Sequence, residues 1–442
     1  MRDRQCGKPE FRKGVNCMEF FLLGLLVSVA LTNHLLFKKR LTSFTLIMGP
    51  YIVIALLNNF VAVNFGFYRI THNTLFMVLI GCFTFFVGNC VVYAASSGKK
   101  LVIRDTIPGG REDILSIPRI KWYVSAVLAV RILQLALLFM KNGLEAMIIN
   151  DFELMLTRGA MGHLMISVFP LIPVLFYNWV LDRKDLYSLL LTAIYFILAF
   201  VETEKAQVLT ITIAVFLYCA FKNRKNLYKG GVIVAAMITL LFIGNYASKF
   251  ILQGYFDKIG AEYYTYRLWN YIAGSLINSR AVTDMFAAIR VNGFDYLADV
   301  LLALPNLFIK GLTGMEIGPD VRVEIPYISD FMSVTIFETG RKAQKGNVIS
   351  TMTYIFGNGN WAAFVLVMIF WGIISEYILV RMYTDGRDAS LMGCCCYMAF
   401  SMVSFFGTYY TSASFTERLI YCLIWAVLFS KKLRFQFIGG SS

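Results

Sequence analysis

Charged residues are scarce in this chain: they make up 15% of its 442 residues, whereas hydrophobic residues make up 58%. A soluble protein carries about 25% charged residues, so the chain lacks the polar surface that a soluble fold requires. Apolar runs near the roughly 20 residues that cross a bilayer recur along its whole length instead, with no obvious internal repeat. Their even spread argues against a separate soluble catalytic domain.

Metal-binding and disulfide motifs are absent from the sequence. Most of the nine cysteines fall inside the apolar runs, and no Cys-x-x-Cys or Cys/His spacing occurs. The three histidines, His34, His72 and His163, are scattered. We therefore expect neither a metal site nor a cofactor.

The apolar runs predict an all-α polytopic membrane protein with about eleven transmembrane helices. The predicted spans are 17–37, 41–64, 73–96, 121–140, 161–181, 185–201, 206–221, 230–248, 361–380, 390–408 and 411–430. A further segment, 297–313, is interrupted by Pro305 and Asn306. We interpret it as an interfacial piece; if it re-enters the bilayer, the count becomes ten or twelve.

These spans divide the chain into three regions and a tail. Residues 1–248 form an N-terminal bundle of about eight helices, and residues 361–438 form about three C-terminal ones. Between them, 249–360 is one large loop, too long to be without function, in which we expect amphipathic helices at the membrane surface. The final Gly-Gly-Ser-Ser at 439–442 is typical of a cloning remnant.

Basic residues predict the orientation. Twenty of the 41 Lys and Arg residues lie in one set of connections: 38–40, 99–121, 182–185, 222–229, 381–388 and 431–434. Cytoplasmic loops carry this excess of positive charge, so the C-terminus is predicted inside and the large loop outside. The net charge of +14 reflects this topology, and nucleic acid is not expected as a partner.

Ionisable residues within the apolar runs are the first candidates for a site. Arg131 lies in the middle of a predicted span, and Glu417 and Arg418 lie near the outer end of the last one. A charge inside a membrane is costly and marks a functional site by default. A buried structural pair is the alternative, and for Arg131 the two interpretations weigh about equally.

The stretch "FVETEKAQVL" (200–209) adds Glu204 and Lys205, between two short predicted spans. These side chains would be held close to the outer membrane surface, near lipid phosphate. The alternative is a structural turn in which Lys205 neutralises Glu202.

Aromatic residues are concentrated at the start of the large loop, in "YYTYRLWNY" (263–271). Trp269 and its tyrosine neighbours suit stacking on sugar rings, or an aromatic belt at the membrane interface. Arg280 follows this amphipathic stretch, and Arg341 opens the donor-rich segment "RKAQKGN".

The arrangement of short spans, a large outer loop and three final helices resembles the Wzy-type oligosaccharide repeat-unit polymerases. The stretch "KGNVISTMTYIFGNGNWAAFVLVMIFWGIISEYIL" resembles the end of that family's loop, with Asn347, Tyr354, Gly357, Gly359 and Gly372 at the matching positions. The family commonly has Arg where this chain has Lys205, which leaves the role of that lysine less defined.

The resemblance implies a GT-C-like fold in the bacterial cytoplasmic (inner) membrane. It implies en bloc transfer of a glycan from undecaprenyl diphosphate to the next lipid-linked repeat unit, on the outer face. The products are O-antigen, capsule or exopolysaccharide. The reaction would be inverting and metal-independent, and a chain-length-regulating co-polymerase is a possible partner.

Such a reaction needs cations for the diphosphate and a base for the attacking hydroxyl. The candidates for binding the diphosphate are Lys205, Arg131, Arg280, Arg341 and Arg418. The candidates for catalysis are Glu204, Asp330 and Glu417. The candidates for binding the rest of the substrate are Arg267, Trp269, Arg322, Lys345 and Asn347.

Other classes fit the sequence less well. A lipid-linked oligosaccharide flippase or a secondary transporter should show two similar halves, which this chain lacks. A membrane acyltransferase should place a His in a polar funnel, and His163 lies next to a short outer loop. An O-antigen ligase resembles the polymerase closely, and the sequence separates the two only weakly.

Overall fold

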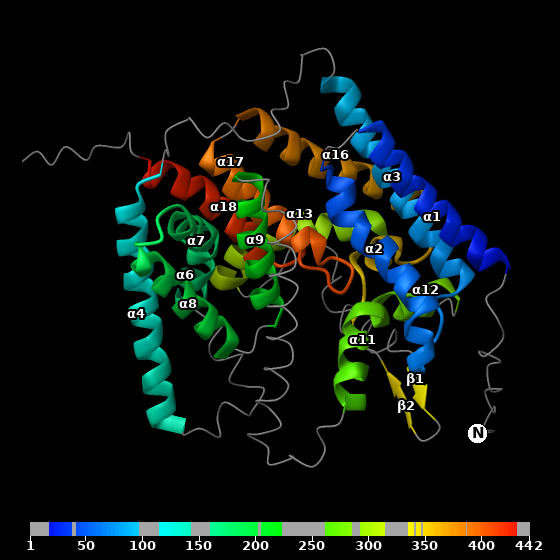
Figure 1. Ribbon diagram of the computed structural model, residues 1–442, viewed down its shortest axis with the longest axis horizontal. Helices are drawn as coiled ribbons and strands as arrows, with labels where there is room; N and C mark the ends of the chain where they lie inside the picture. Colours follow the sequence, from blue (N-terminus) through cyan, green and yellow to red (C-terminus); the bar gives the residue numbers. More distant parts are fainter. Residues whose placement is uncertain are drawn as a thin grey trace, which may run out of the picture. The chain divides into compact units, whose positions relative to one another are not determined.

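A computed structural model of the chain, shown in Figure 1, is predominantly α-helical. It describes residues 17–37, 41–96, 115–142, 160–201, 205–222, 261–284, 292–313, 335–339, 342–345, 348–385 and 387–430.

The described helices and strands follow one another in this order: α1 (Cys17–Leu36), α2 (Ser43–Phe60), the 3₁₀ turn η1 (Ala62–Phe65), α3 (His72–Ser96), α4 (Ile117–Asn142), α6 (Ala160–Val168), the 3₁₀ turn η3 (Phe169–Leu171), α7 (Ile172–Leu181), α8 (Leu186–Val201), α9 (Lys205–Lys222), α11 (Ala261–Asn278), α12 (Arg280–Thr283), α13 (Gly293–Thr313), β1 (Thr335–Thr339), β2 (Lys342–Lys345), α15 (Thr351–Phe356), α16 (Trp361–Asp385), α17 (Asp388–Met402) and α18 (Ala413–Leu428).

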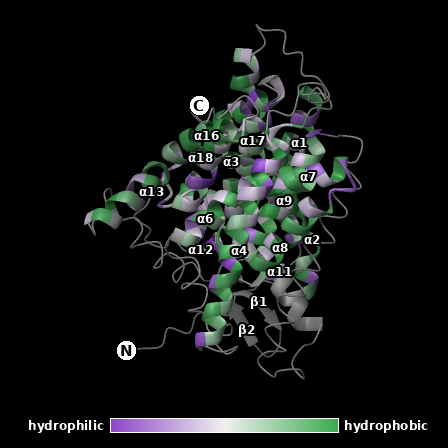
Figure 2. Ribbon diagram, turned by 90° about the vertical axis from the view of Figure 1, so that its left-hand side faces the viewer, coloured by the Kyte–Doolittle hydropathy of each residue, from purple (hydrophilic) through white to green (hydrophobic). Residues whose placement is uncertain are grey.

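Six of the described helical segments are long and apolar enough to cross a membrane: Cys17–Leu36, Ser43–Phe60, His72–Ser96, Ile117–Lys141, Met161–Leu181 and Trp361–Thr384. Two more apolar helices, Leu186–Phe200 and Gln207–Lys222, are shorter. Hydrophobic residues dominate most helices (Figure 2). The chain is therefore a helical membrane protein. Each predicted span coincides with a helix except 230–248, which lies outside the described residues, and the count of eleven remains a prediction.

The chain divides into two compact units. Unit 1 comprises 1–95, 265–376 and 402–411; unit 2 comprises 96–264, 377–401 and 412–442. Each unit therefore contains helices from both ends of the sequence.

In unit 1, α3 and α16 touch backbone to backbone. A Cβ atom placed on Gly88 would lie 2.4 Å from the carbonyl oxygen of Ile369, and one on Gly372 would lie 2.3 Å from that of Phe85. Small residues permit such close helix contacts in membranes. Near the first residues of both helices, the rings of Phe76 and Trp361 meet edge to face, with centroids 5.5 Å apart. The two helices therefore run in the same direction.

A buried carboxylate lies one turn beyond this glycine contact. Glu376 is fully buried, and its Oε2 accepts a hydrogen bond of 2.9 Å from the backbone N–H of Ser43, the first residue of α2. A negative charge is favourable at a helix N-terminus, where backbone N–H groups lack partners. Glu376 thus ties α16 to the start of α2.

Unit 2 packs α6 and α7 against α4, α8, α9 and α18. Pro170 and Pro173 lie where α6 gives way to the turn η3 and then to α7, since proline cannot continue the helical hydrogen-bond pattern. Ser167 holds two neighbours, because its hydroxyl lies 2.6 Å from that of Tyr123 and its carbonyl accepts from the indole of Trp425 at 2.7 Å.

The large loop differs from the prediction in two places. The expectation that Pro305 and Asn306 interrupt the segment is wrong, because α13 continues through both. A proline removes one helical hydrogen bond and can be accommodated within a helix by a kink. The last third of α11, from Ala273 onward, is buried in protein. The loop also contains the antiparallel hairpin β1–β2.

An ion pair joins the start of α4 to the connection between α7 and α8. It should make the stability of the fold depend on pH. Lys121 Nζ lies 2.7 Å from Asp185 Oδ2, and Ser188 Oγ donates to the same oxygen at 2.7 Å. Burial opposes ionisation of Asp185, but the hydrogen bonds from Lys121 and Ser188 outweigh it, so the pKa of this carboxyl is lowered.

Because the folded state holds the Asp185 proton more weakly than the unfolded state, the pair stabilises the fold fully above the ordinary aspartate pKa. That contribution is lost as the pH falls through the lowered folded-state pKa. We expect Asp185→Asn to lower the melting temperature at pH 7 and to make it less sensitive to acid below pH about 4. Asp182→Asn, at an exposed neighbour, should leave the acid dependence as in the wild type. Equal acid profiles for Asp185→Asn and wild type would contradict this account.

Candidate functional site

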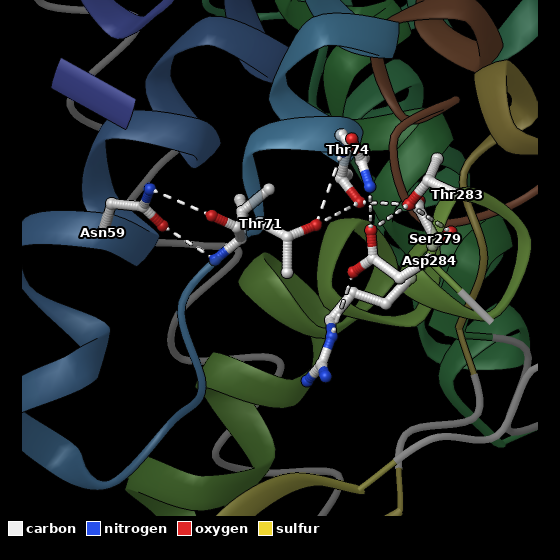
Figure 3. A network of polar contacts seen from close by, with 9 residues as sticks. Asn59, Thr71, Thr74, Ser279, Thr283 and Asp284 are labelled. Atoms are coloured by element: carbon white, nitrogen blue, oxygen red, sulfur yellow. Dashed lines mark hydrogen bonds and ion pairs between the residues drawn. The ribbon is translucent and has the colours of Figure 1, made fainter. Parts of the chain in front are cut away.

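A chain of hydroxyl groups joins distant segments of unit 1 (Figure 3). Thr74, in the first turn of α3, lies 2.7 Å from the hydroxyl of Thr283 in α12. Ser279, just before α12, lies 2.6 Å from the hydroxyl of Thr353 in α15. These groups are buried, and a buried hydroxyl requires a partner. The network therefore fixes the end of α11, α12 and α15 against the start of α3.

Asn59 holds the segment that leads into α3 and this network. Its side-chain amide accepts from the backbone N–H of Ile70 at 2.8 Å and donates to the carbonyl of the same residue at 3.3 Å. The segment that leads into α3 is held by both bonds. Thr71 and Thr74, which follow, are thereby presented to α12 (Figure 3).

Arg280 and Asp284 lie beside the hydroxyl chain. Arg280 Nε is 3.5 Å from Asp284 Oδ2, and Asn73 Nδ2 donates to Asp284 Oδ1 at 2.9 Å. The guanidinium also lies 5.9 Å from the centre of the Tyr68 ring. Only 11% of the Arg280 side chain and 20% of the Asp284 side chain are exposed. A cation and a carboxylate are thus held side by side next to a predicted outer helix end.

Burial sets the electrostatics of this pair. It lowers the pKa of the Arg280 guanidinium, because a charge is less stable away from water, while Asp284 and, less strongly, Tyr68 counteract this effect. Arginine remains charged in proteins even so. A partly dehydrated guanidinium attracts a phosphate much more strongly than one in water does, because the local dielectric constant is lower.

The segment that resembles the polymerase family's loop ending adopts a capped helix and a glycine turn. Ser350 caps α15 by accepting from the backbone N–H of Thr353 at 3.2 Å. Gly357 has φ 48° with ψ −116°, and Gly359 has φ 82°. Backbone conformations of this kind favour glycine. Burial raises the pKa of Tyr354 to about 12.

Unit 2 holds a second ionisable group of residues. His163, in the first turn of α6, places Nδ1 3.0 Å from Glu417 Oε2 in α18. The His163 side chain is 43% exposed, whereas that of Glu417 is 10% exposed. Both residues lie near the helix ends predicted to face outward. A His–carboxylate pair of this kind can hold or transfer a proton.

Arg418 follows Glu417 in α18 but points among aromatic rings. Its guanidinium carbon lies 4.9 Å from the centre of Phe169 and 5.0 Å from that of Phe400, and Nη1 donates to Ser414 Oγ at 3.1 Å. Cation–π contacts stabilise a desolvated guanidinium. This arrangement stabilises α18, and it places the cation away from any exposed surface, since Arg418 is 5% exposed.

Arg131 is almost completely buried in α4, at 1% exposure. Its Nη1 donates to Gln134 Oε1 at 2.6 Å, on the same face one turn further on. Trp269, predicted to bind sugar, stacks instead on Phe65, with ring centroids 5.9 Å apart and planes at 27°. Both observations agree with structural roles for these side chains.

The other predicted site residues have side chains outside the described part of the structure. Lys205 begins α9, Arg267 lies in α11 and Lys345 ends β2, but their side chains are not described. Positions for which neither backbone nor side chain is described are Glu204, Arg322, Asp330, Arg341 and Asn347.

Sequence reasoning missed three residues that the structure places in these clusters, Asp284, Asn73 and His163, and it also missed the buried Glu376 of α16. The spacing of Asp284 from Arg280 is a usable signal, because residues four apart share a helix face. Glu376 is an acid inside a predicted span, which is itself a signal. Nothing in the sequence indicates that His163 contacts Glu417, since 254 residues separate them.

The His163–Glu417 contact should appear as an energetic coupling. We expect His163→Gln and Glu417→Gln each to lower the melting temperature, and the double variant to lose less than the sum, because each single change removes the same contact and His163→Gln also leaves the buried Glu417 carboxylate without its imidazole. The coupling should fall toward the low end of about 0.5–3 kcal/mol, since the half-exposed imidazole is screened by solvent. Additive losses in a double-mutant cycle would show that the contact contributes nothing.

No protein-family model matches this chain, and searches of curated proteins and of solved structures found no match either. Within the described residues, no three His, Cys, Asp or Glu side chains are grouped so as to hold a metal ion. We therefore infer the chemistry of the site from its own cations, carboxylates and hydroxyl groups.

Proposed function

We propose that this protein is a repeat-unit polymerase that joins oligosaccharides carried on undecaprenyl diphosphate, on the outer face of the bacterial cytoplasmic membrane. The observation that carries the proposal is the Arg280–Asp284 pair, with Asn73 and buried hydroxyl groups beside it. It combines a partly dehydrated cation, suited to a diphosphate, with the exposed amide of Asn73, suited to a sugar, and the buried hydroxyl groups hold the segments that carry both. The multi-pass helical architecture supports a lipid-linked substrate.

The reaction forms one bond and breaks one. A hydroxyl oxygen of the incoming repeat unit attacks the anomeric carbon of the growing chain, and the bond from that carbon to the diphosphate oxygen breaks. Undecaprenyl diphosphate leaves with the bonding electrons. The hydroxyl proton passes to a base. The leaving group gains negative charge, so a nearby cation lowers the barrier.

Arg280 would stabilise the charge that develops on the diphosphate. Asp284 would act as a positioning residue, because it contacts Nε of Arg280 and, through Asn73, the start of α3. A carboxylate that contacts the guanidinium in this way fixes its plane, and a fixed planar guanidinium suits phosphate. We expect inversion at the anomeric carbon and no metal requirement.

Unit 2 offers a separate acid–base candidate in Glu417 and His163. Of the three carboxylates predicted as bases, Glu417 is the one whose surroundings the structure describes, and its contact is an imidazole. The half-exposed imidazole would exchange the proton, and the buried carboxylate would orient it. In this proposal Arg418 has a structural role among its aromatic neighbours.

Disrupting the gene in the native cell separates the proposed function from its rivals. A cell without a polymerase should accumulate single lipid-linked repeat units on the outer face and make no long polymer. A ligase defect would leave long polymer on undecaprenyl diphosphate. A flippase defect would leave single units on the inner face. Either of these last two results would replace the proposal.

A further inference from the structure

The helix α13 has its two faces reversed relative to a helix of a soluble protein. The residues of one face are buried: Gly293, Tyr296, Asp299, Ala303 and Asn306. This face is small or polar. The residues of the opposite face are exposed: Phe294, Leu301, Pro305, Phe308 and Leu312. This face is apolar and carries no charge, so its exposure to water would be unfavourable.

The exposed apolar stripe is long and strongly exposed. Leu301 is 68%, Phe308 62% and Leu312 87% exposed. From residue 294 to residue 312 the stripe extends about 27 Å along the helix axis. Figure 2 colours most of α13 as hydrophobic. Single exposed apolar residues are common on proteins, whereas a continuous stripe indicates a surface with a partner.

Contacts within unit 1 fix the depth at which α13 begins. A Cβ atom on Gly293 would lie 3.1 Å from the carbonyl oxygen of Ala363, the third residue of the membrane-spanning helix α16. At the same level the exposed rings of Phe76 and Trp361 meet, at the first turns of α3 and α16. The helix α13 therefore begins at the level where the two spans begin, where their exposed rings lie.

The polar face of α13 is turned into the protein. The hydroxyl of Tyr296 lies 2.9 Å from that of Thr408, and burial raises the pKa of this tyrosine. Asp299 and Asn306 are 6% and 4% exposed. A helix that merely rests on a membrane turns its polar face to water. In α13 that face is covered by protein, which leaves the apolar face for a different environment.

We propose that α13 is a lipid-contacting wall of unit 1, with the stripe Phe294–Leu301–Phe308–Leu312 in contact with the hydrocarbon of the outer leaflet. The partner is bilayer lipid, rather than a second copy of the chain or a soluble protein, because α13 begins beside the first residues of a membrane-spanning helix and protein covers its polar face. α13 is not among the six described helices long and apolar enough to span, and in this proposal it enters the bilayer without crossing it. This proposal does not depend on the proposed enzymatic function.

Spin-label accessibility in lipid bilayers tests the proposal. A spin-labelled amino acid is incorporated at 301 and, in a second variant, at 312, which avoids the native cysteines. Asn64, an exposed polar position in the turn η1, is the matched water control. We expect collisions with oxygen to exceed those with a water-soluble nickel chelate several-fold at 301 and 312, and the ratio to reverse at 64.

Two results would overturn the proposal. If the nickel chelate collides more often than oxygen at 301 and 312, the stripe lies in water. If the labels are immobile and neither reagent reaches them, protein covers the stripe. Because both positions are highly exposed, the labels should not disturb folding; an unchanged melting temperature of the labelled protein checks this.

Discussion

Arg280→Ala should abolish chain extension while the protein still inserts in the membrane. The variant removes a partly dehydrated cation that is held beside a carboxylate in unit 1. Loss of a charge-assisted contact to a leaving diphosphate costs about 3–4 kcal/mol, or roughly 10²–10³ in rate. Arg280→Lys should retain part of the activity, because lysine keeps the charge but loses the planar geometry. The measurement is the length of the polymer ladder.

Two controls separate catalysis from folding. Arg381→Ala removes the same charge at an exposed position predicted to be cytoplasmic and should leave ladders unchanged. If the Arg280–Asp284 pair had only a structural role, Arg280→Gln combined with Asp284→Asn would restore activity, since no buried charge would remain without a partner. We expect that double variant to stay inactive. Normal ladders from it would assign Arg280 a structural role only.

Gly372→Leu should prevent unit 1 from folding. A side chain at this position would meet the backbone of α3, with its Cβ 2.3 Å from the carbonyl oxygen of Phe85. Backbone atoms cannot move aside without separating the two helices. Separation would also pull Glu376 away from the N–H of Ser43. Overpacking typically costs 1–3 kcal/mol, occasionally more, and we expect the upper end or beyond here, with little monodisperse protein extracted in detergent.

A series of glycine-to-alanine variants tests whether close backbone contact causes this loss of folding. Gly88→Ala should be nearly as harmful as Gly372→Ala, because its Cβ would lie 2.4 Å from the carbonyl oxygen of Ile369. Gly81→Ala should be milder, since its nearest neighbour is the flexible sulfur end of Met352 at 2.7 Å. Gly393→Ala, with nothing within 4 Å, should be neutral. If Gly372→Ala melts like Gly393→Ala, close backbone contact is not what joins α3 and α16.

Hydropathy predicted the positions of the helices well, because a membrane-spanning helix satisfies its backbone within one local segment. Every described predicted span is helical. Hydropathy predicted α13 less well: Pro305 suggested a break, and a pattern of apolar residues does not reveal which face the protein covers. The burial of the last third of α11 was missed for the same reason, since tertiary packing decides whether an amphipathic helix meets lipid or protein.

Some charged residues of the described clusters were singled out in the sequence, but their contacts were not. Glu417 and Arg418 stand out because charges are rare in apolar surroundings, and Arg280 stands out because it follows the aromatic amphipathic stretch. The contact of Asn73 with Asp284 joins residues 211 apart, and no local pattern indicates it. The aromatic pair around Arg418 likewise depends on how helices pack. Charge in an apolar sequence thus indicates candidate positions for a site, and packing decides which of those charges are held beside one another.

The most direct measurement uses the purified protein in lipid nanodiscs with a synthetic undecaprenyl-diphosphate-linked repeat unit, and neither nucleotide sugar nor metal added. The account predicts a ladder of products, each one repeat unit longer than the last, with release of one undecaprenyl diphosphate for each step. Product that forms only when a nucleotide sugar is supplied would contradict it.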